Sequence, residues 1–136
     1  GAERAGKNPV DVEVATLLPC AVGDQAEQAI RQMWVVIANH VGGFPRYRRL
    51  MVEAGFEEEI HSIRAAWRSG DLDDAARLVP DSLMQQMALV GCADDCRRKL
   101  DEYRASGITL PIISPRTTGP HAKEQAMSVI RACAPE

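Results

Sequence analysis

The sequence predicts an α/β fold in which three parallel strands are accompanied by a helical insertion. The first observation is a short apolar run from Met87 to Val90, which is followed by a turn at Gly91. The second is a helical segment that stops at Gly107 and leads into another apolar run, Ile108 to Ser114. Two strand-like runs joined through a helix form a βαβ crossover, so we expect them to be parallel neighbours. Unbroken apolar runs are typical of parallel strands that helices cover.

The earlier part of the chain supplies the third strand and a long helix. The run from Val10 to Val22 is rich in Val, Leu and Ala and predicts a strand, with Pro19 ending or bending its ladder. A helix is expected to begin with Asp24 as its cap and to end at Gly42-Gly43. Its apolar face is too wide for a helix that faces solvent.

The next segment is helical by pattern but divided into short pieces. Between Phe44 and Leu83 the pieces are separated by Gly55, Gly70 and Pro80. This predicts a helical insertion at about residues 44–85, which is more than one crossover requires. A final helix is expected after Pro120, since proline is favoured in the first turn.

The crossover helix between Gly91 and Gly107 has charges that agree with its direction. Asp94 and Asp95 lie in its first turn, and Arg104 lies in its last turn. Apolar residues recur every three or four positions and predict one stripe that covers the sheet, namely Ala93, Cys96, Leu100 and Tyr103.

Composition excludes several classes of protein. The 136 residues carry 16 basic and 19 acidic side chains, a formal net charge of −3 without a run of one sign, so nucleic acid is not expected as a partner. No apolar run approaches the ~18 residues of a membrane span, and no secretory leader is recognisable. Cys20, Cys96 and Cys133 fall on apolar elements, which predicts reduced thiols in a cytoplasmic protein.

The stretch ALVGCADDCRRKLDEYRASGITLPIISP resembles the closing segment of the luciferase-like flavin-dependent oxidoreductases, especially the branch that uses the deazaflavin coenzyme F420. VEVATLLPCAVGDQAEQAI is similar to the preceding strand and helix of that family, and VGGFPRYRRLMVEAGFEEEIHSIRAAWRSGDLDDAARLVPDSLM is similar to its helical insertion. Order and spacing carry this resemblance. One departure is Cys92-Ala93, where the family usually has Thr-Pro, so a good cap and a first-turn proline are expected to be lost.

The resemblance implies a (β/α)8 barrel of the triosephosphate isomerase (TIM) type. Such barrels typically need about 250 residues, so residues 1–136 are expected to be the C-terminal part of one. The implied parent enzyme uses FMN or coenzyme F420 as a monooxygenase or reductase, acts on a small-molecule substrate and forms a homo-oligomer. In this family most residues that hold the coenzyme ring come from earlier strands. The isolated chain is therefore expected neither to bind the coenzyme nor to turn over.

The loop after the last strand is the favoured coenzyme site. Barrels often bind phosphate groups there, so Ser114 and Arg116 are expected to contact an anionic part of the coenzyme. The cluster of Arg46, Arg48 and Arg49 is a weaker alternative, because blocks this short are usually solvated helix faces.

Other candidate side chains are interpreted as structural. Cys92-x-x-x-Cys96 differs from the spacing of zinc sites, so no metal ligand is assigned. No histidine has a triad partner at a recognisable spacing, so no catalytic residue is assigned; His121, which follows the last loop, is the one to test. Trp34 and Trp67 lie on helix stripes and are expected to pack in the core.

Two functional hypotheses remain. The first is the C-terminal part of a luciferase-like oxidoreductase. The second is a self-standing α/β module used for association, with the insertion helices as its contact face. Three parallel strands leave two open edges, so both hypotheses predict self-association.

Overall fold

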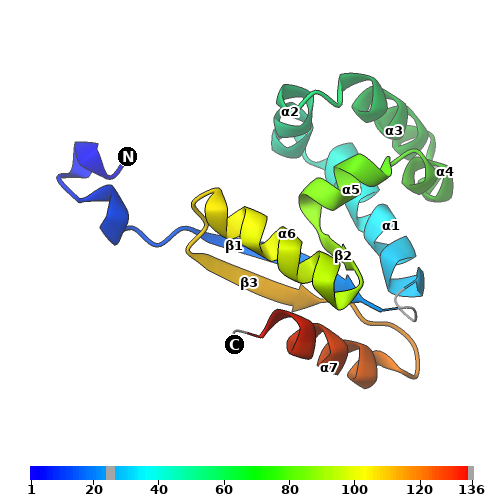
Figure 1. The fold of residues 1–136 in the computed structure, drawn as a ribbon. Helices are drawn as coiled ribbons and strands as arrows, with labels where there is room; N and C mark the ends of the chain where they lie inside the picture. Colours follow the sequence, from blue (N-terminus) through cyan, green and yellow to red (C-terminus); the bar gives the residue numbers. More distant parts are fainter. Residues whose placement is uncertain (24–26, 135–136) are drawn as a thin grey trace.

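The computed structural model describes residues 1–23 and 27–134. Its centre is a parallel three-stranded sheet of β1 (Ala15–Val22), β2 (Leu89–Gly91) and β3 (Leu110–Pro115). Helices accompany the strands throughout (Figure 1). The expected α/β class and the parallel direction are confirmed, and the arrangement is consistent with part of a TIM barrel.

The strands are ordered β2-β1-β3. The expectation that the two strands of the crossover are neighbours is therefore wrong, since β1 lies between them. The reason is the extent of pairing: β3 pairs with β1 over six residues from Ala15 to Cys20, and β2 pairs only over the last three from Cys20 to Val22. The apolar pattern of a crossover predicts that its two strands are parallel. It does not predict whether a third strand lies between them in the sheet.

The first strand is shorter than the sequence predicted. Two short 3-10 turns, Glu3–Ala5 and Pro9–Asp11, precede it. The side chain of Asn8 accepts a hydrogen bond from the backbone N–H of Val10 and caps the second turn. Val10 is 84% exposed, so its apolar character does not mark a buried strand. Figure 1 shows this N-terminal arm extending away from the sheet.

In the part of the chain that the structure describes, five helices separate β1 from β2 and form a layer of their own (Figure 1): α1 (Glu27–Gly43), α2 (Pro45–Glu53), α3 (Glu57–Ser69), α4 (Leu72–Arg77) and α5 (Asp81–Met87). The predicted helix boundaries at Gly55 and Gly70 are confirmed, because both glycines adopt positive φ angles, of 93° and 87°. The expected cap Asp24 lies outside the described residues. Met33, Ile60, Ile63 and Leu83 are the largest fully buried side chains of this layer.

Helices α6 (Ala93–Ala105) and α7 (Ala122–Cys133) cover one face of the sheet. Leu18 and Cys20 of β1 point to this face and pack with Leu100 of α6 and Val129 of α7. The predicted stripe of α6 is confirmed by the burial of Cys96 and Leu100.

Helix α6 keeps its cap despite the departure from Thr-Pro. The Cys92 Sγ accepts a hydrogen bond from the Asp95 N–H at 3.4 Å, and the Asp95 carboxylate accepts one from the Cys92 N–H at 3.2 Å. This is a capping box in which a thiol takes the place of a hydroxyl. The expected loss of the cap is therefore wrong.

The opposite face of the sheet is apolar but largely uncovered. Leu17 of β1 and Ile112 of β3 are register partners on this face, and they are 61% and 45% exposed. In a complete barrel one face of each strand lines the interior and helices cover the other. This face lies opposite α6 and α7, and α1 and α2 lie beside it at Leu17 and Pro19.

No helix of the described chain is long and apolar enough to cross a membrane.

Candidate functional site

The carboxyl ends of the three strands meet at one edge of the sheet, because the strands are parallel. The Gly23 N–H donates to the Gly91 carbonyl at 3.0 Å, which joins the ends of β1 and β2. The Arg116 N–H donates to the Cys20 carbonyl at 2.7 Å, which joins the end of β3 to β1. In α/β barrels this edge carries the catalytic and binding loops.

The loop that follows β3 is held in place on both sides. Thr118 accepts a hydrogen bond from the Gln32 side chain of α1 at 3.1 Å through its hydroxyl. Its backbone N–H donates to the Gln125 side chain of α7 at 2.9 Å. These bonds fix the segment that begins with Arg116.

An apolar groove of about 310 Å³ runs from this edge along the uncovered face. Leu17 and Pro19 form its floor, and α1 and α2 form its wall with Met33, Ile37, His40, Tyr47, Leu50 and Met51. Of the two residues predicted from sequence, Arg116 lines the groove. Ser114 is the register partner of Pro19 and lies on the same face of the sheet.

The Arg116 side chain is half-buried and incompletely bonded. Its Nε is inaccessible to solvent and has no hydrogen-bond partner among the described residues. A buried donor without an acceptor is costly, and a guanidinium in apolar surroundings favours an anionic partner. Arg116 is therefore the polar group in the groove best suited to an acidic ligand.

His40 is a groove residue that sequence reasoning did not favour. Its Nδ1 lies 2.7 Å from the Val36 carbonyl, and its ring packs edge-on against Tyr47 with centroids 4.9 Å apart. Because the carbonyl can only accept, Nδ1 is the donor in this contact. The signal in the sequence was the four-residue spacing that places His40 one turn beyond Val36 on the wall of the groove.

His121 lies elsewhere. It is exposed on the first turn before α7, and its Nδ1 lies 3.0 Å from a Glu124 carboxylate oxygen. His61 is exposed on α3. Neither residue lines the groove described above.

The arginine cluster of α2 has a structural role. Arg48 donates to the carbonyls of Val41 and Gly42 at 3.0 and 2.8 Å and so caps the end of α1. Arg49 forms an exposed ion pair with Glu53. The interpretation of this cluster as a helix face rather than a coenzyme site agrees with these contacts.

Both tryptophans pack against the helical core, as predicted. Trp67 donates from Nε1 to the Asn39 side chain at 3.0 Å. Trp34 lines a separate hollow of about 680 Å³ between α1 and α4, in which Arg77 and Asp81 also lie.

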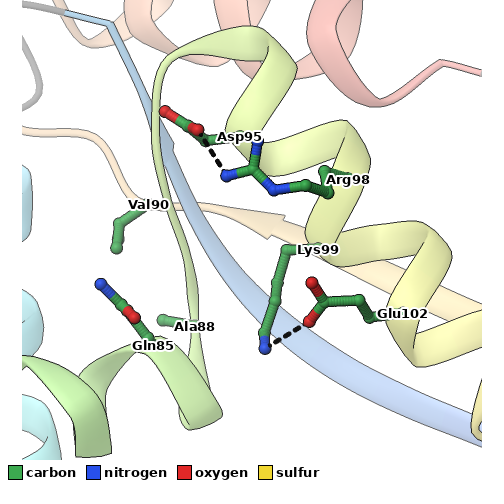
Figure 2. A pocket seen from close by; sticks show the side chains of 7 residues that line it. All are labelled: Gln85, Ala88, Val90, Asp95, Arg98, Lys99 and Glu102. Carbon is green, nitrogen blue, oxygen red and sulfur yellow. Dashed lines mark hydrogen bonds and ion pairs between the residues drawn. The ribbon is translucent and has the colours of Figure 1, made fainter.

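A further hollow of about 310 Å³ lies between the end of α5 and the outer side of α6 (Figure 2). Its charged side chains are paired with each other, Asp95 with Arg98 and Lys99 with Glu102, both at 2.7 Å. The Cys92 thiol, followed by the Arg98 guanidinium, lowers the pKa of Asp95. Because the charges neutralise one another, this hollow offers less to a charged ligand than the groove beside Arg116.

All four cysteines are free, and the described residues contain no group of three or more side chains arranged to hold a metal ion.

Comparison with known proteins matches the sequence model of the family "Luciferase-like monooxygenase" to residues 1–110. The chain is 29% identical over 132 residues to a 5,10-methylenetetrahydromethanopterin reductase of Methanolobus tindarius, covering 96% of this chain and 39% of the relative. It is 24% identical over 119 residues to a "Putative coenzyme F420-dependent oxidoreductase" of Mycobacterium tuberculosis, covering 81% and 33%. The chain thus spans between a third and two fifths of these relatives. With the family model matching most of its length, the chain belongs to the luciferase-like monooxygenase family.

Proposed function

We propose that this chain is the C-terminal part of a coenzyme F420-dependent reductase and that Arg116 binds an anionic group of the coenzyme. The name of one relative specifies coenzyme F420, and the name of the other specifies a reductase. These names favour a deazaflavin over FMN and reduction over oxygenation. The observation that carries the proposal is the buried, unpartnered Nε of Arg116 in an apolar groove at the carboxyl edge of the sheet.

The size of the groove limits what the chain can hold. At about 310 Å³ it is near the lower end of the roughly 300–1,000 Å³ typical of ligand pockets, so it fits only part of a coenzyme. The remainder of the coenzyme would contact residues beyond this chain, which spans only part of its relatives. The 136 residues alone are therefore inactive in this proposal.

The division of roles follows from the chemistry. A bound deazaflavin supplies hydride transfer. The chain supplies position: Arg116 offers a charged fork to an acidic oxygen, and Leu17 and Pro19 offer an apolar surface that excludes water. His40 and Tyr47 add a packed ring surface to the groove wall.

The test is coenzyme affinity in the whole enzyme. Replacing Arg116 with Ala removes a charge-assisted hydrogen bond of about 1.5–3 kcal/mol, so the Kd for coenzyme F420 should rise roughly 10- to 100-fold. Arg116→Lys keeps the charge without the fork and should give a smaller loss. Arg49→Ala removes an exposed arginine outside the groove and serves as the matched control. An unchanged Kd for Arg116→Ala, measured by fluorescence titration, would refute the proposal that Arg116 binds the coenzyme.

A second candidate is self-association through the uncovered face. It is favoured by the exposure of the register partners Leu17 and Ile112, and by the outer strands β2 and β3, which within residues 1–23 and 27–134 pair on one side only. Analytical ultracentrifugation of the isolated chain should then detect dimers that Leu17→Glu dissociates. A monomer at high concentration would rule this out without affecting the coenzyme proposal.

A further inference from the structure

Three of the four cysteines gather where α6 and α7 pack on the sheet. The Sγ atoms of Cys20 on β1 and Cys133 on α7 are 3.9 Å apart. Cys96 of α6 belongs to the same buried cluster as Cys20. Cys20 and Cys96 are fully buried, whereas Cys133 is partly exposed. The cluster therefore has one member that solvent can reach and two that it cannot.

Cys133 faces a cavity of about 300 Å³ between α6 and the end of α7. Arg97 and Arg104 also line this cavity, and Arg97 donates to the Ala132 carbonyl at 3.3 Å. Cys133 is the last residue of α7, and the next residue has an extended backbone. The cavity and the helix end together give a small oxidant a path to the Cys133 thiol and give its side chain room to rotate.

We propose that Cys133 and Cys20 form an oxidative modification site whose substrate is a small hydroperoxide and whose product is an intramolecular disulfide between β1 and α7. A disulfide requires the sulfurs to come within about 2.05 Å. The observed separation of 3.9 Å leaves an approach of just under 2 Å, which rotation of the partly exposed Cys133 side chain can supply.

The reaction proceeds in two balanced steps. The Cys133 sulfur attacks the terminal peroxide oxygen, the O–O bond breaks, and the products are a sulfenic acid on Cys133 and an alcohol, or water from hydrogen peroxide. The Cys20 sulfur then attacks the Cys133 sulfur, the S–OH bond breaks, and the released hydroxide takes the Cys20 proton to leave as water. The two thiols lose two electrons and the peroxide gains them.

The surroundings of the two thiols make their oxidation slow. Burial raises the pKa of the Cys133 thiol. The hydrogen bond with Cys96, followed by burial, raises the pKa of the Cys20 thiol. Since the thiolate is the reactive form, the cross-link should form faster in mildly alkaline than in neutral buffer.

The test is treatment of the folded, purified protein with hydrogen peroxide, followed by alkylation of the remaining thiols. Intact mass should fall by about 2 Da, the two hydrogens lost on disulfide formation, before the alkyl groups are counted. Two thiols should become unreactive. Trypsin should release residues 8–31, which carry Cys20, joined to residues 132–136, which carry Cys133. A reducing agent should separate them.

Two variants and a control complete the experiment. Cys133→Ser should abolish the cross-link, and Cys20→Ala should leave the sulfenic acid on Cys133 for trapping with a dimedone-type reagent. Cys92→Ser removes an exposed thiol outside the cluster and should cross-link as the unmodified protein does. A cross-link that includes Cys92, or Cys20 and Cys133 that both remain free in the folded protein, would overturn the proposal.

Discussion

The contact between Gly42 and Trp67 gives the sharpest stability prediction. Gly42 lies near the end of α1, and a Cβ added there would lie 2.3 Å from Cγ and Cδ2 of the Trp67 indole. An ordinary contact begins at 3.4 Å, so the ring would have to move by about 1 Å. The ring is held by its hydrogen bond to Asn39 at 3.0 Å and by packing against the helical core.

Opposing effects determine the magnitude for Gly42→Ala. Alanine gains up to about 1 kcal/mol over glycine inside a helix. Overpacking costs about 1–3 kcal/mol, and loss of the Trp67 hydrogen bond costs about another 1 kcal/mol. We therefore expect the free energy of unfolding to fall by about 1–3 kcal/mol.

Gly43→Ala is the matched control because it is the next residue of the same helix. Its Cβ would meet only Trp67 Cζ2 at 3.8 Å, an ordinary contact, so the helix propensity gain should leave stability unchanged or raised by up to about 1 kcal/mol. Urea denaturation followed by far-ultraviolet circular dichroism measures both variants. If Gly42→Ala proved as stable as Gly43→Ala, the packing argument would be refuted.

Three further predictions concern the helix ends and the core. Cys92→Ser should raise the free energy of unfolding by up to about 1 kcal/mol in urea titrations, since a hydroxyl is a stronger cap than a thiol; a loss of stability would contradict the capping role. The pKa of Asp95 is lowered in the folded chain. Its carboxylate therefore adds to the free energy of unfolding above the unfolded pKa, and this stabilisation is lost as pH falls through the folded pKa. In Asp95→Asn the free energy of unfolding, measured by urea titration at several acidic pH values, should therefore fall less as pH is lowered. The same fall as in the unmodified protein would exclude this role of Asp95. Leu83→Ala should cost about 2–5 kcal/mol by calorimetry because Leu83 is fully buried, whereas Leu72→Ala, at a 42% exposed site, should change little.

The elements that sequence predicted best are those with strong local signals. Gly55 and Gly70 mark helix ends because both require positive φ angles, and the stripe of α6 faces the sheet as its spacing requires. Parallel pairing also follows from local information, because two strands joined by a helix are not connected by the short turn of an antiparallel hairpin. These features depend on neighbours in the chain.

The features that sequence reasoning missed depend on distant contacts. The place of β1 between β2 and β3 is set by the hydrogen-bonded register from Ala15 to Cys20, which no local pattern encodes. The start of β1 was placed too early because Val10 and Val12 are apolar yet exposed. The cap at Cys92 was missed because a thiol is a weak acceptor, and the Asp95 carboxylate compensates by bonding back to the Cys92 N–H.

The candidate site was predicted only in part. Arg116 was singled out from its position after the last strand, and its place in the groove depends on α1 and α2 coming over the sheet. His40 could not be preferred over His121 from the sequence. The groove that His40 lines is completed by Tyr47 of α2 and Leu17 of β1, which belong to different elements.

The position of β1 in the middle of the sheet also constrains the order in which the chain can fold. The Val14 N–H donates to the hydroxyl of Thr109, a residue 95 positions later in the chain, and the whole β1 and β3 register lies beyond this point. Such non-local pairing incurs a large loop-closure entropy and forms slowly. During synthesis, β1 leaves the ribosome long before its longer partner, so its apolar strand waits unpaired while the five helices between β1 and β2 assemble. Nascent chains arrested before Leu110 should therefore be the ones most dependent on chaperones.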